Sequence, residues 1–455
     1  MTPVSIYLKL RDKYRNTIML ESSDYHGDED AFSYVCCDPI ASFTLDKGKV
    51  TRQWPDGTQD ESTPTDRQQV AQLLSEFATS FEVEEQEYKF INSGLFGYMG
   101  YDAVEYYEDI NLDENDQYEY NIPEIRYHVY RNIIVIDHFK NELYVFEHSH
   151  EPIVDDSGIN YAVTLINSKN VPSYTFGLEG EETSNFTDPE FLEVIDKGIQ
   201  HCNRGDVFQI VLSRRFRHHF KGDEFNVYRA LRSINPSPYL FYFDYGTYKL
   251  MGSSPEAQIV IKGKEASIYP IAGTFRRTGN DHKDAELARK LYDDPKENSE
   301  HVMLVDLARN DLSRNGDEVK VQTFKEIQYY SHVIHLVSHV TGQISEGMSN
   351  FRMVADTFPA GTLSGAPKHM AMTLINRYEN VRRGYYGGAI GYLGFNGDFN
   401  HAIMIRSLLS TNNTLYYQAG AGVVAKSIRE SELQEVHNKL AALRNAIEIA
   451  QTLNA

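Results

Sequence analysis

The chain of 455 residues is longer than the size at which one hydrophobic core usually keeps growing, so we expect one large fold or two closely packed regions. The composition, with 41% hydrophobic and 24% charged residues, is typical of a soluble globular protein. The net charge of −21 argues against nucleic acid as a partner, because nucleic-acid binding needs clustered cations. No uncharged apolar run approaches the ~18 residues that a membrane span needs, so we expect no membrane partner.

The first thirty residues and the cysteines indicate the compartment. The opening segment mixes Lys, Arg, Glu and Asp and lacks a continuous apolar core before a cleavage site, so we expect no export and a cytoplasmic location. Cys36, Cys37 and Cys202 fit neither a disulfide framework nor a CxxC metal knuckle. They are typical of reduced cytosolic thiols, and none has the setting of a glutaminase nucleophile.

The chain divides most clearly at the low-complexity stretch GLEGEETSN. We predict an N-terminal region at 1–176, a linker at 177–186 and a second region at 187–455. The second region opens with a helix, because Thr187 and Glu190 have capping-box spacing and Gly205 supplies a stop. Its later part mixes β-branched runs and a few long helices without regular alternation, which predicts an α+β fold with largely antiparallel sheets.

A buried helix is predicted over 295–312. Glu297 and Glu300 project on the same side as Leu304 and Leu307, and residues 302–308 are apolar nearly all round. Carboxylates that enter the interior must be neutralised by a cation, an Arg or Lys, or a proton. The alternative is that both lie at an exposed first turn, where the helix dipole favours them.

The last helix carries a second acidic stripe of Glu432 and Glu435 beside Lys439. Taken alone, Glu435 and Lys439 have the spacing of an ordinary surface ion pair. Taken with the first helix, two Glu-x-x-Glu pairs supply the oxygen ligands that Mg²⁺ accepts while it keeps waters and a substrate carboxylate. A metal could therefore bridge the two helices.

Two glycine-rich segments and one arginine are candidates for anion binding. QAGAGVV and PAGTLSGAPK can expose successive N–H groups to a carboxylate, although tight turns without function are equally common. Neither segment matches a nucleotide-binding motif. Arg406 is expected inside the apolar strand AIMIRSLL, where its guanidinium needs either a substrate carboxylate or an internal Asp or Glu.

His332, His335 and His339 are close enough in sequence to suggest zinc. In a strand, however, His335 and His339 share a face that His332 does not, and no cysteine is nearby. We therefore favour core or surface histidines over a zinc site.

These segments together resemble the chorismate-utilising enzyme family. The strings that carry the resemblance are LVDLARNDL, FPAGTLSGAPK, RRGYYGGAIGY, YYQAGAGVV and ELQEVHNK, in the family's order, and the match extends from Met19 to Lys439. The resemblance implies two orthogonal, largely antiparallel β-sheets packed together with helices outside. It also implies that chorismate binds in a cleft of the C-terminal half.

The resemblance implies a Mg²⁺ cofactor that holds the ring carboxylate of chorismate. Glu300 and Glu435 are similar to the principal metal ligands of the family, with Glu297 and Glu432 nearby or bonding through water.

The resemblance also implies catalytic and substrate-binding residues. Glu256 matches the candidate general acid at the C4 hydroxyl, and His335 is our candidate for assisting the final elimination. Lys439 and Thr362 are further candidates for anion binding and hydroxyl contact. The remaining implied chorismate contacts are Gly273, Thr274, Tyr386, Arg406, Gly420, Ala421 and Gly422.

Two positions separate the branches of the family by nucleophile. Gln209 stands where isochorismate and salicylate synthases have a lysine that activates water, and an amide cannot act as that base. Ala272 stands where most aminodeoxychorismate synthases have a lysine that attacks the ring. The resemblance thus implies anthranilate synthase component I, which adds ammonia to C2, loses the C4 hydroxyl and eliminates pyruvate. It implies a glutamine amidotransferase subunit as the partner that supplies ammonia.

The N-terminal half resembles the tryptophan feedback site of anthranilate synthases. The segments MLES and NPSPYLFYF carry this resemblance, and Met19 and Leu240 stand where leucine and methionine are usual. Both exchanges keep apolar bulk, so we expect feedback to survive. The implied contacts of L-tryptophan are Glu21, Ser22, Pro238, Tyr239 and Leu240.

Two alternative functions stay open. The chain could be component I of an aminodeoxychorismate synthase of the folate pathway, which can retain a similar tryptophan pocket. It could also be a non-catalytic tryptophan-binding regulator that kept the fold.

Overall fold

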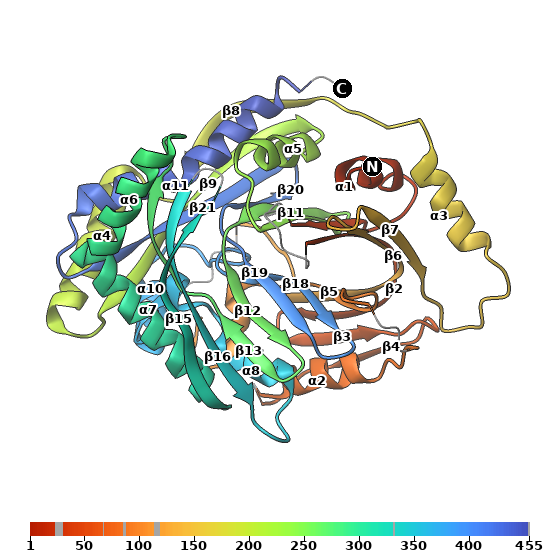
Figure 1. The fold of residues 1–455 in the computed structure, drawn as a ribbon, viewed down its shortest axis with the longest axis horizontal. Coiled ribbons are helices and arrows are strands. Elements are labelled where there is room, and N and C mark those ends of the chain that lie inside the picture. Colours follow the sequence, from red (N-terminus) through yellow and green to blue (C-terminus); the bar gives the residue numbers. More distant parts are fainter. Residues whose placement is uncertain (23–30, 67, 85–87, 113–118, 331–332, 454–455) are drawn as a thin grey trace.

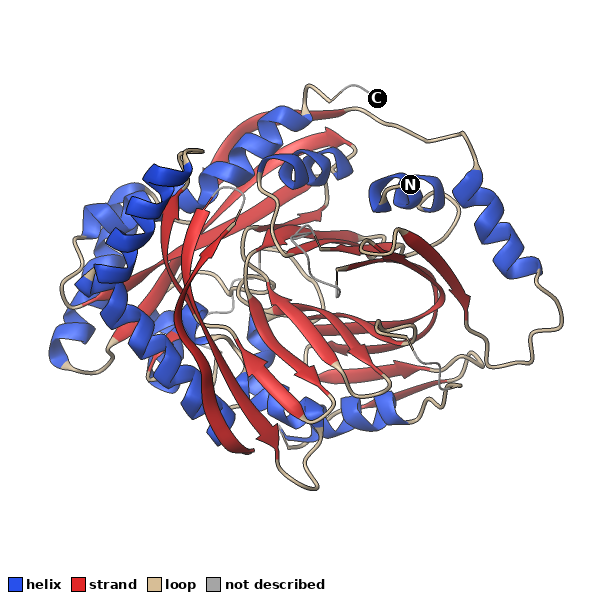
Figure 2. Cartoon of the chain, in the orientation of Figure 1, coloured by secondary structure: helices blue, strands red, loops and turns tan. Residues whose placement is uncertain are grey.

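The computed structural model describes residues 1–22, 31–66, 68–84, 88–112, 119–330 and 333–453. Every strand pairing between described residues is antiparallel. Most helices lie along the outside of the strands (Figures 1 and 2). The predicted α+β class with largely antiparallel sheets is confirmed.

The strands form two sheets that share two long strands, β2 (Phe32–Asp46) and β6 (Ile125–Asp137). The first half of β2 pairs with β1, and its second half pairs with β3. Asp38 has a φ of 62°, and the register of β2 against β6 shifts between Pro39 and Ala41. Such a bulge bends a strand and allows it to pass from one sheet to the next.

The first sheet contains the strands nearest the candidate site. In order of pairing they are β8 (Phe176–Ser184), β9 (Gln209–Gly222), β21 (Thr414–Val424), β20 (Ser407–Thr411), β11 (Tyr248–Ser254), β10 (Tyr239–Asp244) and β1 (Ile18–Glu21), followed by β2, β6 and β7 (Glu142–Glu147). The short strand β17 (Gly365–Ala366) also pairs with β9.

The second sheet continues from the other halves of β2 and β6. From β6 it runs through β5 (Gly94–Met99), β18 (Ala389–Gly394), β19 (Phe399–Ile403), β12 (Ala257–Lys262), β13 (Glu265–Ile268) and β16 (Val333–Ile344), which also pairs with β14 (Ile271–Arg276) and β15 (Gly316–Tyr329). From β2 it runs through β3 (Lys49–Gln53) and β4 (Gln59–Ser62).

The helices surround these strands. They are α1 (Pro3–Leu10), α2 (Gln68–Thr79), the 3₁₀ helix η1 (Tyr101–Tyr106), α3 (Ser157–Asn167), α4 (Asp188–Arg204), α5 (Phe225–Ile234), α6 (Asp281–Asp293), α7 (Pro295–Ser313), α8 (Asn350–Thr357), α9 (Gly361–Ser364), α10 (Lys368–Tyr378) and α11 (Arg429–Ala450). No helix among the described residues is both long and apolar enough to cross a membrane.

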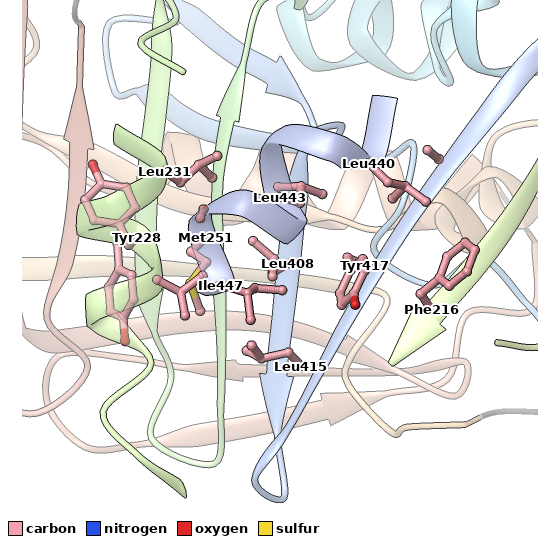
Figure 3. Packing of buried hydrophobic residues seen from close by; sticks show 14 of the residues in the cluster. Phe216, Tyr228, Leu231, Met251, Leu408, Leu415, Tyr417, Leu440, Leu443 and Ile447 are labelled. Carbon is pink, nitrogen blue, oxygen red and sulfur yellow. The ribbon is translucent and has the colours of Figure 1, made fainter. Parts of the chain in front are cut away.

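Local sequence signals account for several of these elements. The predicted capping box of Thr187 and Glu190 starts α4, and Gly205 ends it with a φ of 84°. On α11, Leu440, Leu443 and Ile447 are buried against the first sheet (Figure 3). Burial of each such side chain stabilises the fold by ~1.5–3 kcal/mol, so packing fixes α11 on β20 and β21.

The predicted linker at 177–186 differs from the structure. Residues Phe176–Ser184 form β8, which pairs with β9 and has a register shift between Glu179 and Thr183. The polar composition of this stretch gives no sign of a strand. An edge strand such as β8 can be polar because it obtains its hydrogen bonds from the neighbouring strand β9. Strands from both sides of this stretch pair with each other, β1 with β10 and β5 with β18. The domain boundaries themselves stay a prediction.

Candidate functional site

Strand β21 forms the centre of the candidate site with its predicted anion-binding segment Gly420–Gly422. Gly420 lies opposite Ser213 and Gly422 lies opposite Val211 on β9. A Cβ atom on Gly422 would lie 2.5 Å from Nε2 of Gln209. Any side chain at Gly422 would therefore displace the Gln209 amide.

The α7 carboxylates lie against the sheets. The Gln209 amide Nε2 donates a hydrogen bond of 3.1 Å to Oε1 of Glu300. A Cβ atom on Gly273 would lie 3.0 Å from Oε2 of Glu297, so that carboxylate lies beside the Gly273 backbone. Both glutamates are half-buried. The inward orientation predicted for them therefore describes the structure better than an exposed first turn, although Glu297 does lie in the first turn of α7.

Glu435 and Lys439 of α11 lie beside strand β21. Lys439 Nζ is 2.7 Å from Oε1 of Glu435 and donates a hydrogen bond of 2.8 Å to the Gly420 carbonyl. The side chains of Lys439 and Glu435 are 44% and 46% exposed, whereas Glu432 is buried. The ion pair between Glu435 and Lys439, which their spacing suggested, is thus present. Lys439 also links this pair to the backbone of β21.

A metal-binding cluster is not assembled in the described part of the chain. No three His, Cys, Asp or Glu side chains there come close enough to hold an ion. Of the three histidines considered for zinc, His332 lies outside the described residues and His339 hydrogen-bonds to Ser267. Glu300 contacts Gln209 on β9, and Glu435 pairs with Lys439, which donates to Gly420 on the neighbouring strand β21.

Glu256 and Thr362 come together as a hydrogen-bonded pair. The Thr362 hydroxyl donates to Oε1 of Glu256 at 3.1 Å, across a separation of 106 residues. Burial raises the pKa of Glu256 to about 7, and this effect is partly offset by Thr362 and by the positive charges of Arg406 and Lys439. A carboxyl group with this pKa is partly protonated near neutrality and can act as an acid.

Arg406 is placed differently from the prediction. It does not lie inside a strand but between β19 and β20, with a φ of 49°. The local break was hidden by the apolar residues on both sides, which continue the strand pattern. Burial lowers the pKa of Arg406, and the charge of Glu256 opposes this effect. Arg406 forms no ion pair with an Asp or Glu of the described residues, so the internal partner that the sequence left open is not found.

The His335 ring is fixed by a hydrogen bond to the backbone of Gly273. Its Nδ1 lies 3.0 Å from the Gly273 carbonyl oxygen, and the side chain is only 4% exposed. Because a carbonyl can only accept, we assign the ring proton to Nδ1, which leaves Nε2 as an acceptor. Burial lowers the pKa of His335. The hydrogen bond to Gly273 opposes this effect, and the positive charge of Arg406 adds to it. The ring is therefore neutral near pH 7.

Two further predicted contacts lie beside these groups. Tyr386 is buried, and burial raises the pKa of its hydroxyl group, while a hydrogen bond with the backbone of Gly420 opposes the shift. Thr274 pairs with His335 between β14 and β16, but its side chain lies outside the described part of the structure.

One buried ion pair in the site has no counterpart among the predicted residues. Arg383 contacts both carboxylate oxygens of Glu379 at 2.6 and 2.9 Å. Its guanidinium also donates to the carbonyls of Leu363 and Val211. Leu363 directly follows Thr362 in α9, and Val211 of β9 lies opposite Gly422. The i,i+4 spacing of Glu379 and Arg383 was the available signal for the ion pair, whereas the carbonyl groups that accept from Arg383 are distant in sequence.

The residues predicted for tryptophan are adjacent in space. Glu21 lies opposite Leu240 in the pairing of β1 with β10, and Ser22 directly follows β1. Glu21 is buried and accepts hydrogen bonds from Tyr228 at 2.6 Å and from Arg232 at 2.9 Å. Tyr239 begins β10 and Pro238 directly precedes it.

Comparison with known proteins decides the family. A family model described as chorismate binding enzyme matches residues 17–445. The chain belongs to the chorismate-binding enzyme family. It is 37% identical to anthranilate synthase component 1 of Aquifex aeolicus, over 99% of this chain and 93% of the relative. It is 35% identical to anthranilate synthase component 1 of Thermus thermophilus, over 99% of this chain and 96% of that relative.

Solved structures support the same assignment. Anthranilate synthase component I from Streptococcus pneumoniae TIGR4 matches with a TM-score of 0.81 and 30% identity, over 98% of each chain. MenF, the menaquinone-specific isochorismate synthase from Escherichia coli, matches with a TM-score of 0.73 over 98% of this chain and 91% of that chain. Its identity of 19% shows the fold alone. The resemblance to anthranilate synthase component I is confirmed.

The two positions expected to separate the chorismate-binding enzymes by nucleophile both lie in the site. Gln209 contacts Glu300, and Ala272 is a buried residue of β14 beside Gly273. Neither side chain can attack an electrophile or remove a proton from water.

Proposed function

We propose that this chain converts chorismate and ammonia to anthranilate and pyruvate, as component I of an anthranilate synthase in tryptophan biosynthesis. The observation that carries the proposal is the hydrogen bond between Gln209 and Glu300 in a site whose other discriminating position is Ala272. An amide that donates to a carboxylate cannot activate water, and a methyl group cannot attack the ring. Free ammonia is the nucleophile consistent with both.

Arg406 and β21 are the groups best suited to hold the carboxylates of chorismate. The Arg406 guanidinium is half-buried and lacks an acidic partner among the described residues, so a substrate carboxylate would replace part of its lost hydration. We assign Gly420–Gly422 of β21 as the backbone segment that contacts the substrate, because its polar main-chain groups can bind an anion.

Mg²⁺ suits the donor set of the two helices. All four candidate ligands are carboxylates, and Mg²⁺ is usually held by one or two carboxylates together with water and substrate, so a protein cluster of three ligands is not required. We assign Glu300 and Glu435 as the residues that would hold it, with Glu297 and Glu432 in support. When bound, the metal would neutralise and fix the ring carboxylate.

Glu256 and His335 divide the proton transfers between them. As ammonia adds to C2, the bond from C4 to oxygen breaks, and protonated Glu256 donates its proton to the departing hydroxyl group, which leaves as water. The amino intermediate then loses the proton at C2 to Nε2 of His335, while the bond from C3 to the enolpyruvyl oxygen breaks. The added nitrogen releases the third proton of ammonia to water, the departing enolpyruvate takes a proton at its methylene carbon and becomes pyruvate, and the ring becomes aromatic.

Product analysis tests the proposed function. The purified chain should form fluorescent anthranilate from chorismate, Mg²⁺ and ammonium, and omission of ammonium should abolish the product. Formation of 4-amino-4-deoxychorismate would assign the chain to folate synthesis. Tryptophan binding by calorimetry without chorismate turnover at any ammonium concentration would identify a non-catalytic regulator.

Glu300→Gln is expected to raise the Mg²⁺ concentration for half-maximal activity by ~10–100-fold, the range found when groups that support a metal are removed. The exchange removes a charge but keeps the side-chain shape and a partner for Gln209. Titration of activity with Mg²⁺ measures the effect. Glu286→Gln on α6, whose side chain is 61% exposed, is the matched control and should leave the titration unchanged. An unchanged titration for Glu300→Gln would remove Glu300 from the metal site.

We further propose that a glutamine amidotransferase subunit delivers the ammonia and that L-tryptophan inhibits the chain. The name of the relatives, component 1, supports a second component. The pairing of β1 with β10 supports a tryptophan site at Glu21, Ser22 and Leu240. The free, buried cysteines are consistent with a cytoplasmic location.

Ser22→Leu is expected to raise the tryptophan concentration for half-inhibition by ~10-fold or more, because overpacking a fitted site costs ~1–3 kcal/mol. Ser22 is half-buried directly after β1, so the larger side chain would occupy space next to Leu240. Inhibition curves at fixed chorismate measure the change. Ser149→Leu at an exposed position serves as the control. Unaltered inhibition of Ser22→Leu would place the tryptophan site elsewhere.

A further inference from the structure

Glu256 also lines a pocket between α7, α9 and the start of β12. The pocket measures about 370 Å³, its solvent-open part included. Its lining includes the predicted site residues Glu256 and Thr362 but not Arg406, His335 or Gly420–Gly422. Its size admits ordered water. The remaining polar residues of the wall are Gln258, Asp311, Thr357 and Thr362.

Asp311 is the second carboxyl group on this wall. It is 7% exposed and its Oδ2 lies 2.6 Å from Nζ of Lys368 on α10. Lys368 Nζ also donates a hydrogen bond of 2.8 Å to the Thr357 carbonyl. The charges of Arg314 and Glu108 act on Asp311 as well, and the side chain of Arg314 is 42% exposed. Asp311 therefore lies between the pocket and groups that reach solvent.

The side chain of Gln258 has a polar atom that a water molecule in the pocket could satisfy. Its Nε2 donates a hydrogen bond of 3.1 Å to the Thr357 hydroxyl. Its Oε1 is buried and has no hydrogen-bond partner among the described residues. Buried acceptors in native proteins are nearly always satisfied, and an unsatisfied acceptor of a residue that lines a pocket is suited to a bound water.

We propose that Asp311 passes protons through water in this pocket to Glu256 and so restores the acid form of Glu256 after each turnover. The proposal rests on the proposed function, in which Glu256 gives one proton to the departing C4 hydroxyl group. The Glu256 carboxylate then takes a proton from a pocket water. That water takes the proton of the Asp311 carboxyl group, and Asp311 is protonated again from solvent. One proton enters for each hydroxyl group that leaves as water.

The charged surroundings of the two carboxyl groups support such a transfer. Burial raises the pKa of Asp311 to about 6, against the charges of Lys368 and Arg314, and burial raises the pKa of Glu256 to about 7. The groups that face Glu256 are Thr362, Arg406 and Lys439. Transfer from Asp311 to Glu256 is therefore slightly downhill near neutral pH.

Asp311→Asn in the full chain tests the proposal. We expect kcat with saturating chorismate and ammonium to fall by ~10-fold or more, less than the ~10²–10⁴-fold of direct general acid catalysis, with an unchanged KM for chorismate. Imidazole or acetic acid should restore kcat in proportion to the acid concentration, because a small acid can enter the pocket and protonate Glu256 directly. The wild-type rate should not respond to either acid. Asp306→Asn, on the same helix with a 60% exposed side chain, is the matched control.

Gln258→Met is the second variant and keeps the test decisive if Asp311→Asn does not fold. It leaves the Asp311–Lys368 pair in place but removes the unsatisfied acceptor, and the same acid-restorable loss of kcat is expected. A wild-type kcat in either folded variant overturns the proposal, and so does a loss that no added acid restores. If the wild-type chain itself forms no anthranilate, the proposed function fails; if it does and the variants behave normally, only the relay fails.

Discussion

Glu256→Gln is expected to lower kcat by ~10²–10⁴-fold, the contribution typical of general acid catalysis. The amide keeps a carbonyl acceptor for the Thr362 hydroxyl group but has no proton to give to the departing C4 hydroxyl. Steady-state anthranilate fluorescence measures the effect, and a KM for chorismate close to the wild-type value would separate lost chemistry from lost binding.

The pH profile of the wild type checks the same assignment. Glu256 must be protonated, so kcat should fall as pH rises through about 7. His335 must be neutral, and its lowered pKa places the acidic loss of activity below its usual range near 6.5. A bell-shaped profile results, and its alkaline limb should disappear in Glu256→Gln. Retention of that limb in the variant would assign the acid to another group.

The free energy of unfolding provides an independent test of the raised pKa of Glu256. Its folded-state pKa is raised from 4.5 to about 7, so the folded state holds an extra proton and loses stability as pH rises through this range. At pH 8, Glu256→Gln removes the cost of the buried charge and should raise the free energy of unfolding by ~1–3 kcal/mol. Denaturant unfolding at pH 4 should show a smaller gain. A variant that is both inactive and more stable is the expected mark of a functional carboxyl group.

Arg406→Gln is expected to lower kcat/KM for chorismate by ~30–3,000-fold, since the loss of one partner of a buried charge pair costs ~2–5 kcal/mol. In the free protein, burial lowers the pKa of Arg406, which means that its charge is held at a cost. The variant should therefore unfold at a higher temperature than the wild type. Kinetics and thermal unfolding of one preparation measure both effects.

Arg309→Gln is the control for Arg406, because the Arg309 side chain is 54% exposed and pairs with Asp306 in a neighbouring turn of α7. It should change neither measurement. Wild-type kinetics of Arg406→Gln, or a lowered unfolding temperature, would show that the guanidinium serves the fold and not the substrate.

Local signals in the sequence predicted the elements that carry the site. The capping box at Thr187, the stop at Gly205 and the long helices 295–313 and 429–450 depend on neighbouring residues, and these are visible in the sequence. Strand β8 and the break at Arg406 were missed for the opposite reason. The first depends on hydrogen bonds from β9, and the second interrupts a pattern that stays apolar on both sides.

The contacts that organise the site were beyond sequence reasoning. Thr362 meets Glu256 across 106 residues, and Arg383 donates to the carbonyls of Leu363 and Val211 inside the core. Asp311 belongs to a recognised string, but its position near Glu256 depends on how α7 packs beside α9. Sequence predicts which residue types the chemistry needs, whereas packing decides which of them meet.

The source of the atom added to the ring tests the central claim most directly. The chain should be incubated with chorismate, [¹⁵N]ammonium and Mg²⁺ in H₂¹⁸O, and the ring products analysed by mass spectrometry. Ammonia as the nucleophile predicts anthranilate that carries ¹⁵N and ring products without ¹⁸O. A hydroxylated ring product that contains ¹⁸O, or ¹⁵N attached at C4, would contradict the account of Gln209 and Ala272.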